Sequence, residues 1–247
     1  MYSLELWDKL KNLKTEYQWI DLTHELSTKT PHWNGWPDLS EKEMSSLDNS
    51  LFGAHEYTFV GQYGTHVDAP NHMVKGGRSL DEIEIDEMIY PLCVIDKSDE
   101  VEKNVDYSLT KQDILGWEGM YGKIPQGAMV FFKSGWSRRN PADMDNLDED
   151  GNRHFPGWSL EAVKFLVEER NIGSIGHETS DTEAPILSEK SGYEVEYYIL
   201  SQNKIQIELV NNLDKLPPVG AVVFCIFPKA KNGTGFPARC FALSPKE

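Results

Sequence analysis

Short apolar runs rich in Val, Ile and Phe recur along the chain, and most of them are bounded by glycine or proline. Apolar runs of about four to eight residues with such boundaries are typical of buried β-strands, because an amphipathic helix needs a longer segment with a period of 3.6 residues. The sequence therefore predicts a sheet of several buried strands. The runs are WIDLT (19–23), HEYTFVG (55–61), PLCVIDK (91–97), GAMVFFKSG (127–135), IGSIGHE (172–178) and GAVVFCIFP (220–228).

Helical periodicity is limited to a few segments. The clearest is residues 159–170 (SLEAVKFLVEER), where Ser159 is the expected N-cap and residues 171–173 end the helix. Segments 79–89 and 109–118 are predicted to be short helices, and 195–212 fits a helix followed by a strand.

The first 18 residues predict an amphipathic helix. Its apolar face comprises Leu4, Trp7, Leu10 and Leu13. No linker or repeat divides the rest of the chain, and strands alternate with few helices. The sequence therefore predicts one mixed α/β domain over residues 1–247.

The composition excludes some partners. The chain has 40 acidic and 24 basic residues, a formal net charge of −16, which argues against nucleic acid or an anionic membrane as partner. No apolar run approaches the roughly 18–20 residues of a membrane span, and the N-terminus lacks the apolar block of a signal peptide. The three cysteines lie in apolar runs and are expected to be reduced thiols, so a cytoplasmic protein is predicted.

The segment GQYGTHVDAPNH, which begins at residue 61, contains two histidines and an aspartate around a proline. In an extended strand His66 and Asp68 project from the same face, and Gln62 shares that face if the strand stays regular. The proline is expected to end the strand and let His72 turn back toward the cluster. An imidazole and a carboxylate that converge in this way suit a divalent transition ion, although the spacing alone also fits ordinary polar surface.

GTHVDAPNH resembles the core of the H-x-G-T-H-x-D-x-P-x-H signature of the cyclase-like metal hydrolases, which include bacterial kynurenine formamidase and isatin hydrolase. The resemblance covers residues 19–244. It implies a swivelling-type β/β/α fold with a mixed sheet, assembled as a homodimer or homotetramer with sites near an interface. Further matches occur in the same order: WIDLTHELSTKTPHWNGWP, GGRSLDEI, IPQGAMVFFKSGW, IGHETSDTEAP, IELVNNLDKLPPVG and FPKAKNGTGFPARCFAL.

The resemblance also implies a metal site and a proton-transfer residue. His66 and Asp68 stand at the family's metal-binding His and Asp, and Glu208 stands at the late Glu that completes the metal shell. His72 stands at the family's proposed acid/base. Gln62 replaces the first histidine of the signature, so it is expected either to ligate the metal through its amide oxygen or to donate a hydrogen bond from behind the ligands.

One divalent ion is expected. Kynurenine formamidase binds a second zinc through a histidine before the late Glu, whereas residues 178–247 contain no histidine and Glu196 falls near that place. Oxygen-rich ligands around one imidazole favour Mn²⁺, with Zn²⁺ possible. The loop 146–157 resembles half of a calcium loop, but Gly157 stands where a bidentate Glu is needed, and a solvated loop is the alternative.

A substrate pocket is predicted from aromatic and histidine side chains. Trp33 matches the aromatic residue that borders the substrate in the family, and Trp36 and Phe52 are expected to extend an aromatic wall. His32 adjoins Trp33, and His177 follows an apolar run that can end at the rim of a site. For His177, a core or rim residue held by one hydrogen bond is the alternative.

These features predict a hydrolase that uses metal-activated water to open a small amide or lactam, such as an aryl formamide or an isatin-like compound. The bond is a C–N bond other than a peptide bond, and His72 would move the proton from water to the leaving nitrogen. The same site would also suit a lactone or ester. Because Gln62 departs from the signature, a third interpretation is a metal-binding or small-molecule-binding protein that has lost catalysis.

Overall fold

A nine-stranded mixed sheet organises the chain, which the computed structural model describes from residue 4 to residue 246 apart from the side chain of Glu189. Its strands are β1 (Tyr17–Asp21), β4 (His66–Asp68), β5 (Ile89–Asp96), β7 (Met129–Lys133), β9 (Ser174–His177), β10 (Gln206–Glu208), β11 (Ala221–Ile226), β12 (Gly235–Pro237) and β13 (Arg239–Pro245). Their order is β1-β13-β11-β5-β7-β9-β10-β4-β12. The central β5, β7, β9 and β10 run parallel, and the outer strands join antiparallel.

Smaller elements surround this sheet. The helices are α1 (Glu5–Glu16), α2 (Ser98–Lys103), α3 (Lys111–Tyr121), α4 (Leu160–Arg170), α5 (Pro185–Ser191) and α6 (Glu194–Ser201). The short strands pair as β2 (Ser40–Ser45) with β3 (Ala54–Thr58), and as β6 (Ser108–Leu109) with β8 (Gly157–Trp158). Six 3₁₀ turns complete the described elements: η1 (Pro70–His72), η2 (Leu80–Glu82), η3 (Ile85–Met88), η4 (Trp136–Arg138), η5 (Pro141–Asp143) and η6 (Leu213–Lys215).

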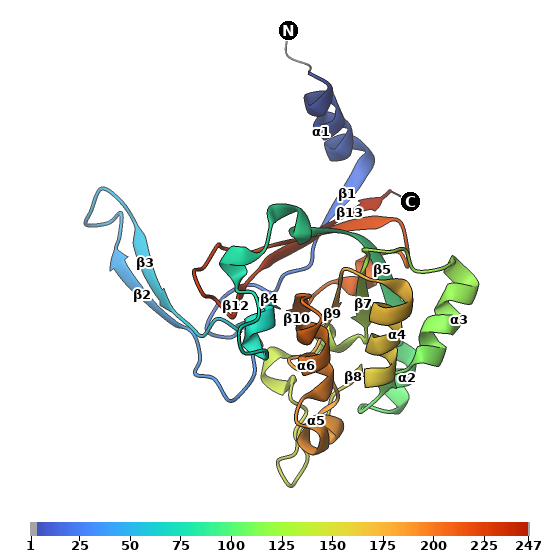
Figure 1. Ribbon diagram of the computed structural model, residues 1–247. Helices are drawn as coiled ribbons and strands as arrows, with labels where there is room; N and C mark the ends of the chain where they lie inside the picture. The colour runs from blue at the N-terminus through green and yellow to red at the C-terminus, as the bar shows by residue number, and fades with distance from the viewer. Residues whose placement is uncertain (1–3, 247) are drawn as a thin grey trace.

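The sheet carries an apolar core on each of its faces. In β7, Met129 and Phe131 belong to one cluster, whereas Val130 and Phe132 belong to the other, because successive side chains of a strand point to opposite faces. The helices α3, α4 and α6 supply apolar side chains to the second cluster and lie together beside the sheet (Figure 1). Burial on both faces explains why the central strands read as continuous apolar runs.

The mixed α/β fold expected from the sequence is confirmed, and most of the predicted elements form. Ser159 caps α4, since its Oγ accepts the N–H of Ala162, and Asn171 ends the helix in the left-handed conformation at φ 49°. The segment 195–212 contains α6 apart from its first residue, followed by the whole of β10, as predicted. The predicted helix over 79–89 is wrong, because the chain there makes the two 3₁₀ turns η2 and η3.

Two predictions for the segment before the metal motif are also wrong. The run HEYTFVG was expected to be a buried strand, yet β3 is largely exposed and forms with β2 a hairpin that projects from the body (Figure 1). The strand also does not continue to His66, because β3 ends at Thr58 and the chain then turns, with Gly64 at φ +63°, before β4 begins. A Cβ at Gly64 would lie 2.8 Å from Cγ2 of Thr30, so glycine suits this turn for two reasons.

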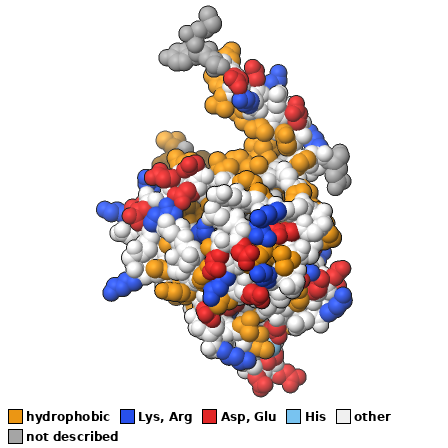
Figure 2. All heavy atoms as spheres, turned by 45° about the vertical axis from the view of Figure 1, so that its right-hand side comes forward, with side chains coloured by type: hydrophobic (Ala, Val, Ile, Leu, Met, Phe, Trp, Pro, Cys, Tyr) orange, Lys and Arg blue, Asp and Glu red, His pale blue; other side chains and the backbone are white. Residues whose placement is uncertain are grey.

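The N-terminal helix stands apart from the body. The predicted helix over 1–18 forms as α1 over residues 5–16, and its residues 1–3 lie outside the described part. None of the α1 residues is buried, and Trp7 is 71% exposed. Figure 2 shows apolar side chains gathered along this protruding helix. Between residues 4 and 246, no helix is both long and apolar enough to cross a membrane.

Candidate active site

The register of two short strands brings the predicted ligands together. β4 lies between β10 and β12 and runs antiparallel to both. In β10, Glu208 lies opposite His66 and Gln206 lies opposite Asp68. Directly opposed side chains of an antiparallel pair share one face, so all four side chains project to the same side of the sheet. This pairing joins residues that are about 140 positions apart in the chain.

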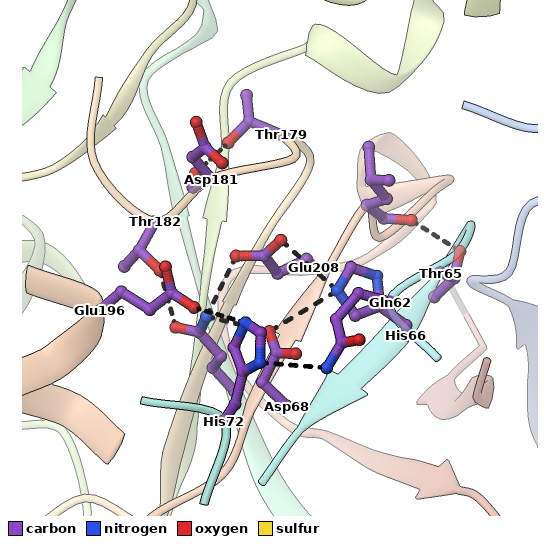
Figure 3. A network of polar contacts seen from close by, with 12 residues as sticks. Gln62, Thr65, His66, Asp68, His72, Thr179, Asp181, Thr182, Glu196 and Glu208 are labelled. Atoms are coloured by element: carbon purple, nitrogen blue, oxygen red, sulfur yellow. Dashed lines mark hydrogen bonds and ion pairs between the residues drawn. The ribbon is translucent and has the colours of Figure 1, made fainter. Parts of the chain in front are cut away.

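His66, Asp68 and Glu208 form a compact buried cluster. Nε2 of His66 lies 3.6 Å from Oδ2 of Asp68 and 3.5 Å from Oε2 of Glu208 (Figure 3). The three ligand atoms lie within 4.8 Å of one another, and each residue is less than 5% exposed. Nδ1 of His66 lies 2.8 Å from the carbonyl oxygen of Gly64, which can only accept a hydrogen bond. That contact fixes the tautomer and leaves Nε2 with its lone pair toward the cluster.

Gln206 holds the two carboxylates from behind. Its Nε2 donates to Oδ2 of Asp68 at 3.1 Å and to Oε1 of Glu208 at 3.0 Å. The hydroxyl of Thr182 donates to Oε1 of Gln206 at 2.8 Å, which fixes the orientation of the amide. Gln206 and Thr182 are fully buried, so this network sets the positions of both carboxylates before any ligand binds.

The charges and unused acceptors of the cluster fit a divalent cation. Burial raises the pKa of Glu208, and the nearby charges of Asp68 and Glu196 raise it further. Burial also opposes ionisation of Asp68, but His66 and other neighbours lower the pKa of that carboxyl to about 2. Oδ1 of Asp68 is buried and has no hydrogen-bond partner among the described residues. One imidazole nitrogen and two carboxylates therefore converge with an acceptor left free, a donor set that suits a divalent transition ion.

His177 lies beneath this cluster. It is almost completely buried, and its Nε2 lies 3.3 Å from Oε1 of Glu208. Burial lowers the pKa of His177 to about 3, so the ring is neutral near pH 7. A neutral imidazole donates from Nε2 to Glu208 and supports that carboxylate.

His72 projects toward the cluster from the turn η1, which follows β4 through Pro70. Nε2 of Gln62 lies 3.2 Å from Nδ1 of His72 and also donates to Oγ1 of Thr234 at 3.3 Å. On its other side, Nε2 of His72 lies 3.5 Å from Oε1 of Glu196 (Figure 3). The imidazole therefore has a polar neighbour at each ring nitrogen.

A cavity of about 190 Å³ opens onto this set of side chains. Trp33 and Trp36 line it and pack edge to face, with ring centroids 5.1 Å apart. Asp181 also lines it; burial raises the pKa of this carboxyl to about 7 although Nη1 of Arg153 lies 2.7 Å away. The whole lining comprises Trp33, Trp36, Gln62, His66, Asp68, His72, Met73, Ser180, Asp181, Tyr193, Glu196 and Glu208.

The structure separates the predicted site residues into two groups. The seven that line the cavity are Trp33, Trp36, Gln62, His66, Asp68, His72 and Glu208. Three predicted substrate contacts do not line it. Phe52 is 64% exposed on the connection between β2 and β3, because that hairpin leaves the body. His32 stacks on Tyr63 and lines a neighbouring cavity instead, and His177 is buried below Glu208.

Several residues of the site were missed from the sequence. Gln206 has a readable signal, since it lies two positions before Glu208 in a strand and therefore shares its face. Glu196 and Tyr193 reach the cavity from α6 and the residue before it, and Ser180 and Asp181 reach it from the loop after β9. Glu196 was noted only as falling near the place of a second zinc-binding histidine, and Ser180 and Asp181 only as part of the match IGHETSDTEAP, because only the tertiary packing brings these side chains and Tyr193 to the cavity.

Side-chain oxygens of the acidic loop 146–157 accept hydrogen bonds from other groups of the protein. The carboxylate of Asp148 accepts hydrogen bonds from the backbone N–H groups of Asp150 and Asn152. Oδ1 of Asn146 accepts a hydrogen bond from Arg139. Within the described residues, His66, Asp68 and Glu208 are the group of His, Cys, Asp or Glu side chains placed to hold an ion, so the loop contacts favour the solvated alternative.

Comparisons with known proteins agree with this geometry. Residues 20–184 match the family described as "Putative cyclase". The chain is 31% identical to an isatin hydrolase of Roseibium aggregatum, over 96% of this chain and 95% of that protein. The solved structure of isatin hydrolase A from Labrenzia aggregata, bound to benzyl benzoate, superposes with a TM-score of 0.91 at 34% identity, over 98% and 100% of the two chains. Isatin hydrolase A from Ralstonia solanacearum gives 0.90 at 31%, over 99% and 98%.

Proposed function

The chain belongs to the cyclase family, and on that premise we propose that it is a metal-dependent hydrolase that opens the C–N bond of a small, isatin-like amide or lactam. The observation that carries the proposal is the convergence of buried His66, Asp68 and Glu208 on a cavity that also holds His72. The likeness to isatin hydrolases along nearly the whole chain supports the substrate class.

The residues of the cavity suit hydrolysis by water. A divalent ion held by His66, Asp68 and Glu208 would polarise the scissile carbonyl and lower the pKa of water. His72 takes a proton from the attacking water as its oxygen adds to the carbonyl carbon. The C–N bond then breaks, and His72 returns the proton to the leaving nitrogen, which gives a carboxylic acid and an amine. Proton transfer of this kind typically contributes about 10²–10⁴-fold in rate.

We propose one ion per chain, with Mn²⁺ favoured and Zn²⁺ possible. Two carboxylates and one imidazole form an oxygen-rich donor set of the kind that suits Mn²⁺. The amide oxygen of Gln62 is the proposed further ligand. Its amide nitrogen is engaged by His72 and Thr234, whereas its Oε1 has no hydrogen bond among the described residues.

The cavity supports an aromatic or ring-bearing substrate. Trp33 and Trp36 offer apolar ring surfaces beside the ligands, and aromatic pairs of this kind bind planar rings well. An aryl formamide fits the same description. A lactone or ester is the alternative bond for this site, and a binding protein without catalysis is the alternative class.

A substrate panel tests the proposal. We expect purified protein loaded with Mn²⁺ or Zn²⁺ to hydrolyse isatin or an aryl formamide, and a chelator to abolish the reaction. His72→Ala is expected to keep the metal and lose about 10²–10⁴-fold in turnover. Preference for a lactone or ester would change the bond assignment. Bound metal with no turnover on any of these compounds would favour the binding class.

We also propose a cytoplasmic homodimer or homotetramer. The family resemblance suggests the assembly, and exposed apolar side chains support it, including Leu6 and Trp7 on α1 at 75% and 71% exposure (Figure 2). The three cysteines are free and buried, which is consistent with a reducing compartment.

A further inference from the structure

Glu196 is a buried carboxylate with an unusual set of neighbours. It is 7% exposed at the wall of the cavity, and the other carboxylates nearby include Asp68, Asp181 and Glu183. The basic side chain in contact with it is His72, whose Nε2 lies 3.5 Å from Oε1. Burial and the neighbouring carboxylates raise the pKa of Glu196, so its ionised form needs a hydrogen-bond donor or a cation, and His72 is the donor within reach.

The backbone of Glu196 is held in place by a second buried acid. Glu183 is fully buried, and its two carboxylate oxygens accept the N–H groups of Val195 and Glu196 at 3.2 Å each. These are among the first N–H groups of α6, which have no partner within the helix. The cap fixes the start of α6, and α6 packs against the turn η1 that carries His72.

The two polar neighbours of His72, Glu196 and Gln62, favour the same tautomer of its ring. A carboxylate beside Nε2 is an acceptor and favours a proton on that nitrogen. The amide nitrogen of Gln62 is a donor and favours a lone pair on Nδ1. Oγ1 of Thr234 accepts from the same amide nitrogen, which agrees with this orientation of the Gln62 side chain. Both contacts therefore select the Nε2–H form of His72.

We infer that Glu196 is a positioning residue that holds His72 as its Nε2–H tautomer, so that Nδ1, whose lone pair accepts from the amide of Gln62 in the resting site, takes the proton from water once that hydrogen bond opens. The inference rests on the proposed hydrolase function. When Nδ1 takes the proton, the ring becomes an imidazolium, and the carboxylate of Glu196 balances that charge until the proton passes to the leaving nitrogen. A carboxylate behind a catalytic histidine acts in this way in serine proteases.

The first test reads the tautomer and needs no turnover. Nitrogen-15 NMR of histidine-labelled protein loaded with Zn²⁺, whose charge favours the ionised form of Glu196, identifies the protonated nitrogen of His72, and the His72 signals are assigned by their loss in His72→Ala. We expect the Nε2–H form in the wild type and a mixture of tautomers in Glu196→Leu. A wild-type Nδ1–H form, or the same tautomer in both proteins, would overturn the inference even if the enzyme hydrolyses isatin.

The second test separates positioning from metal binding. In Glu196→Leu we expect kcat to fall about 10²–10³-fold, with KM within about threefold and one metal ion still bound per chain. Glu196→Gln keeps the size of the side chain but not the charge, and we expect its kcat to lie between those of Glu196→Leu and the wild type. If Glu196→Leu fails to fold, Glu196→Gln takes its place in the test. Glu194→Gln, an exposed change in the same helix turn, is the control. Loss of a bound metal ion in either Glu196 variant would instead make Glu196 a metal ligand.

Discussion

Gln206 shows how a residue that touches neither metal nor substrate can determine the site. Its single amide nitrogen serves Asp68 and Glu208 together, and Thr182 fixes which end of the amide faces them. The side chain is fully buried, so water cannot replace the lost donor when it is removed. Partners of metal ligands in such positions typically contribute 10–100-fold to metal affinity.

Gln206→Leu is therefore expected to weaken metal affinity about 10–100-fold, because both carboxylates lose their shared donor. Calorimetric titration of the chelator-treated protein measures this effect. Gln202→Leu, at an exposed position at the end of α6, is the matched control and should bind as the wild type does. Equal affinities in the two variants would exclude Gln206 from control of the site.

His24 carries a prediction about acid stability. Its Nε2 is buried and has no hydrogen-bond partner in the described part of the chain, and burial lowers the pKa of the ring to about 4. The unfolded chain binds a proton at this histidine near pH 6.5 while the folded chain does not, so stability is present above that pH and is lost as pH falls toward 4.

Between pH 7 and 5 we expect this single group to remove about 1–2 kcal/mol of the free energy of unfolding. Urea unfolding at several pH values measures it. His24→Gln cannot titrate, so the loss should be smaller in that variant by the same amount. Identical pH profiles for the two proteins would show that His24 is protonated to the same degree in the folded and unfolded chain.

At the scale of elements, the site depends on short strands and turns that local sequence patterns describe poorly. The long apolar strands β5, β7 and β11 were predicted from their continuous apolar runs, which burial on both faces explains for β7, whereas β11 alternates buried and more exposed residues. The strand β4 has three residues, and its alternation was correctly used to pair His66 with Asp68. Its neighbours β10 and β12 come from distant parts of the chain, so the place of Thr234 beside Gln62 could not be predicted, whereas Gln206 follows from Glu208 by the alternation of a strand.

The cap of α6 is the element on which the cavity wall depends. Glu183 accepts two N–H groups at the start of this helix, and burial raises the pKa of its carboxyl. We expect Glu183→Gln to lower the free energy of unfolding by about 1–3 kcal/mol, because one buried N–H group then faces an amide donor. Chemical denaturation measures the change.

The control for this experiment is Glu161→Gln, an exposed change in the first turn of α4, which should stay within about 0.5 kcal/mol of the wild type. A Glu183 variant as stable as that control would mean that the N–H groups of α6 find other partners, and that the carboxylate is not needed as a cap.

At the scale of the whole molecule, two parts project from the body, and contacts within one chain do not bury their apolar side chains. The helix α1 buries none of its residues, although an isolated helix of this length is marginal in water. The hairpin of β2 and β3 also projects and exposes Met44, Leu47 and Leu51. These surfaces are consistent with the proposed assembly, and the removal of Phe52 from the chain's own cavity follows from the same projection.

Light scattering coupled to gel filtration tests that assembly. A chain of 28.1 kDa is expected to elute as a species of two or four chains at micromolar concentration. A mass equal to one chain would contradict the proposed homodimer or homotetramer and would leave α1 exposed in solution.

The central claim is that one divalent ion at His66, Asp68 and Glu208 supports hydrolysis, and a single titration tests it most directly. Chelator-treated protein is titrated with Mn²⁺, and in parallel with Zn²⁺, while the opening of isatin is recorded. We predict that activity returns with the added metal and saturates at one ion per chain, and that Asp68→Ala regains none because an anionic ligand is lost. Activity that persists without metal, that saturates at two ions per chain, or that returns fully in Asp68→Ala would contradict the account.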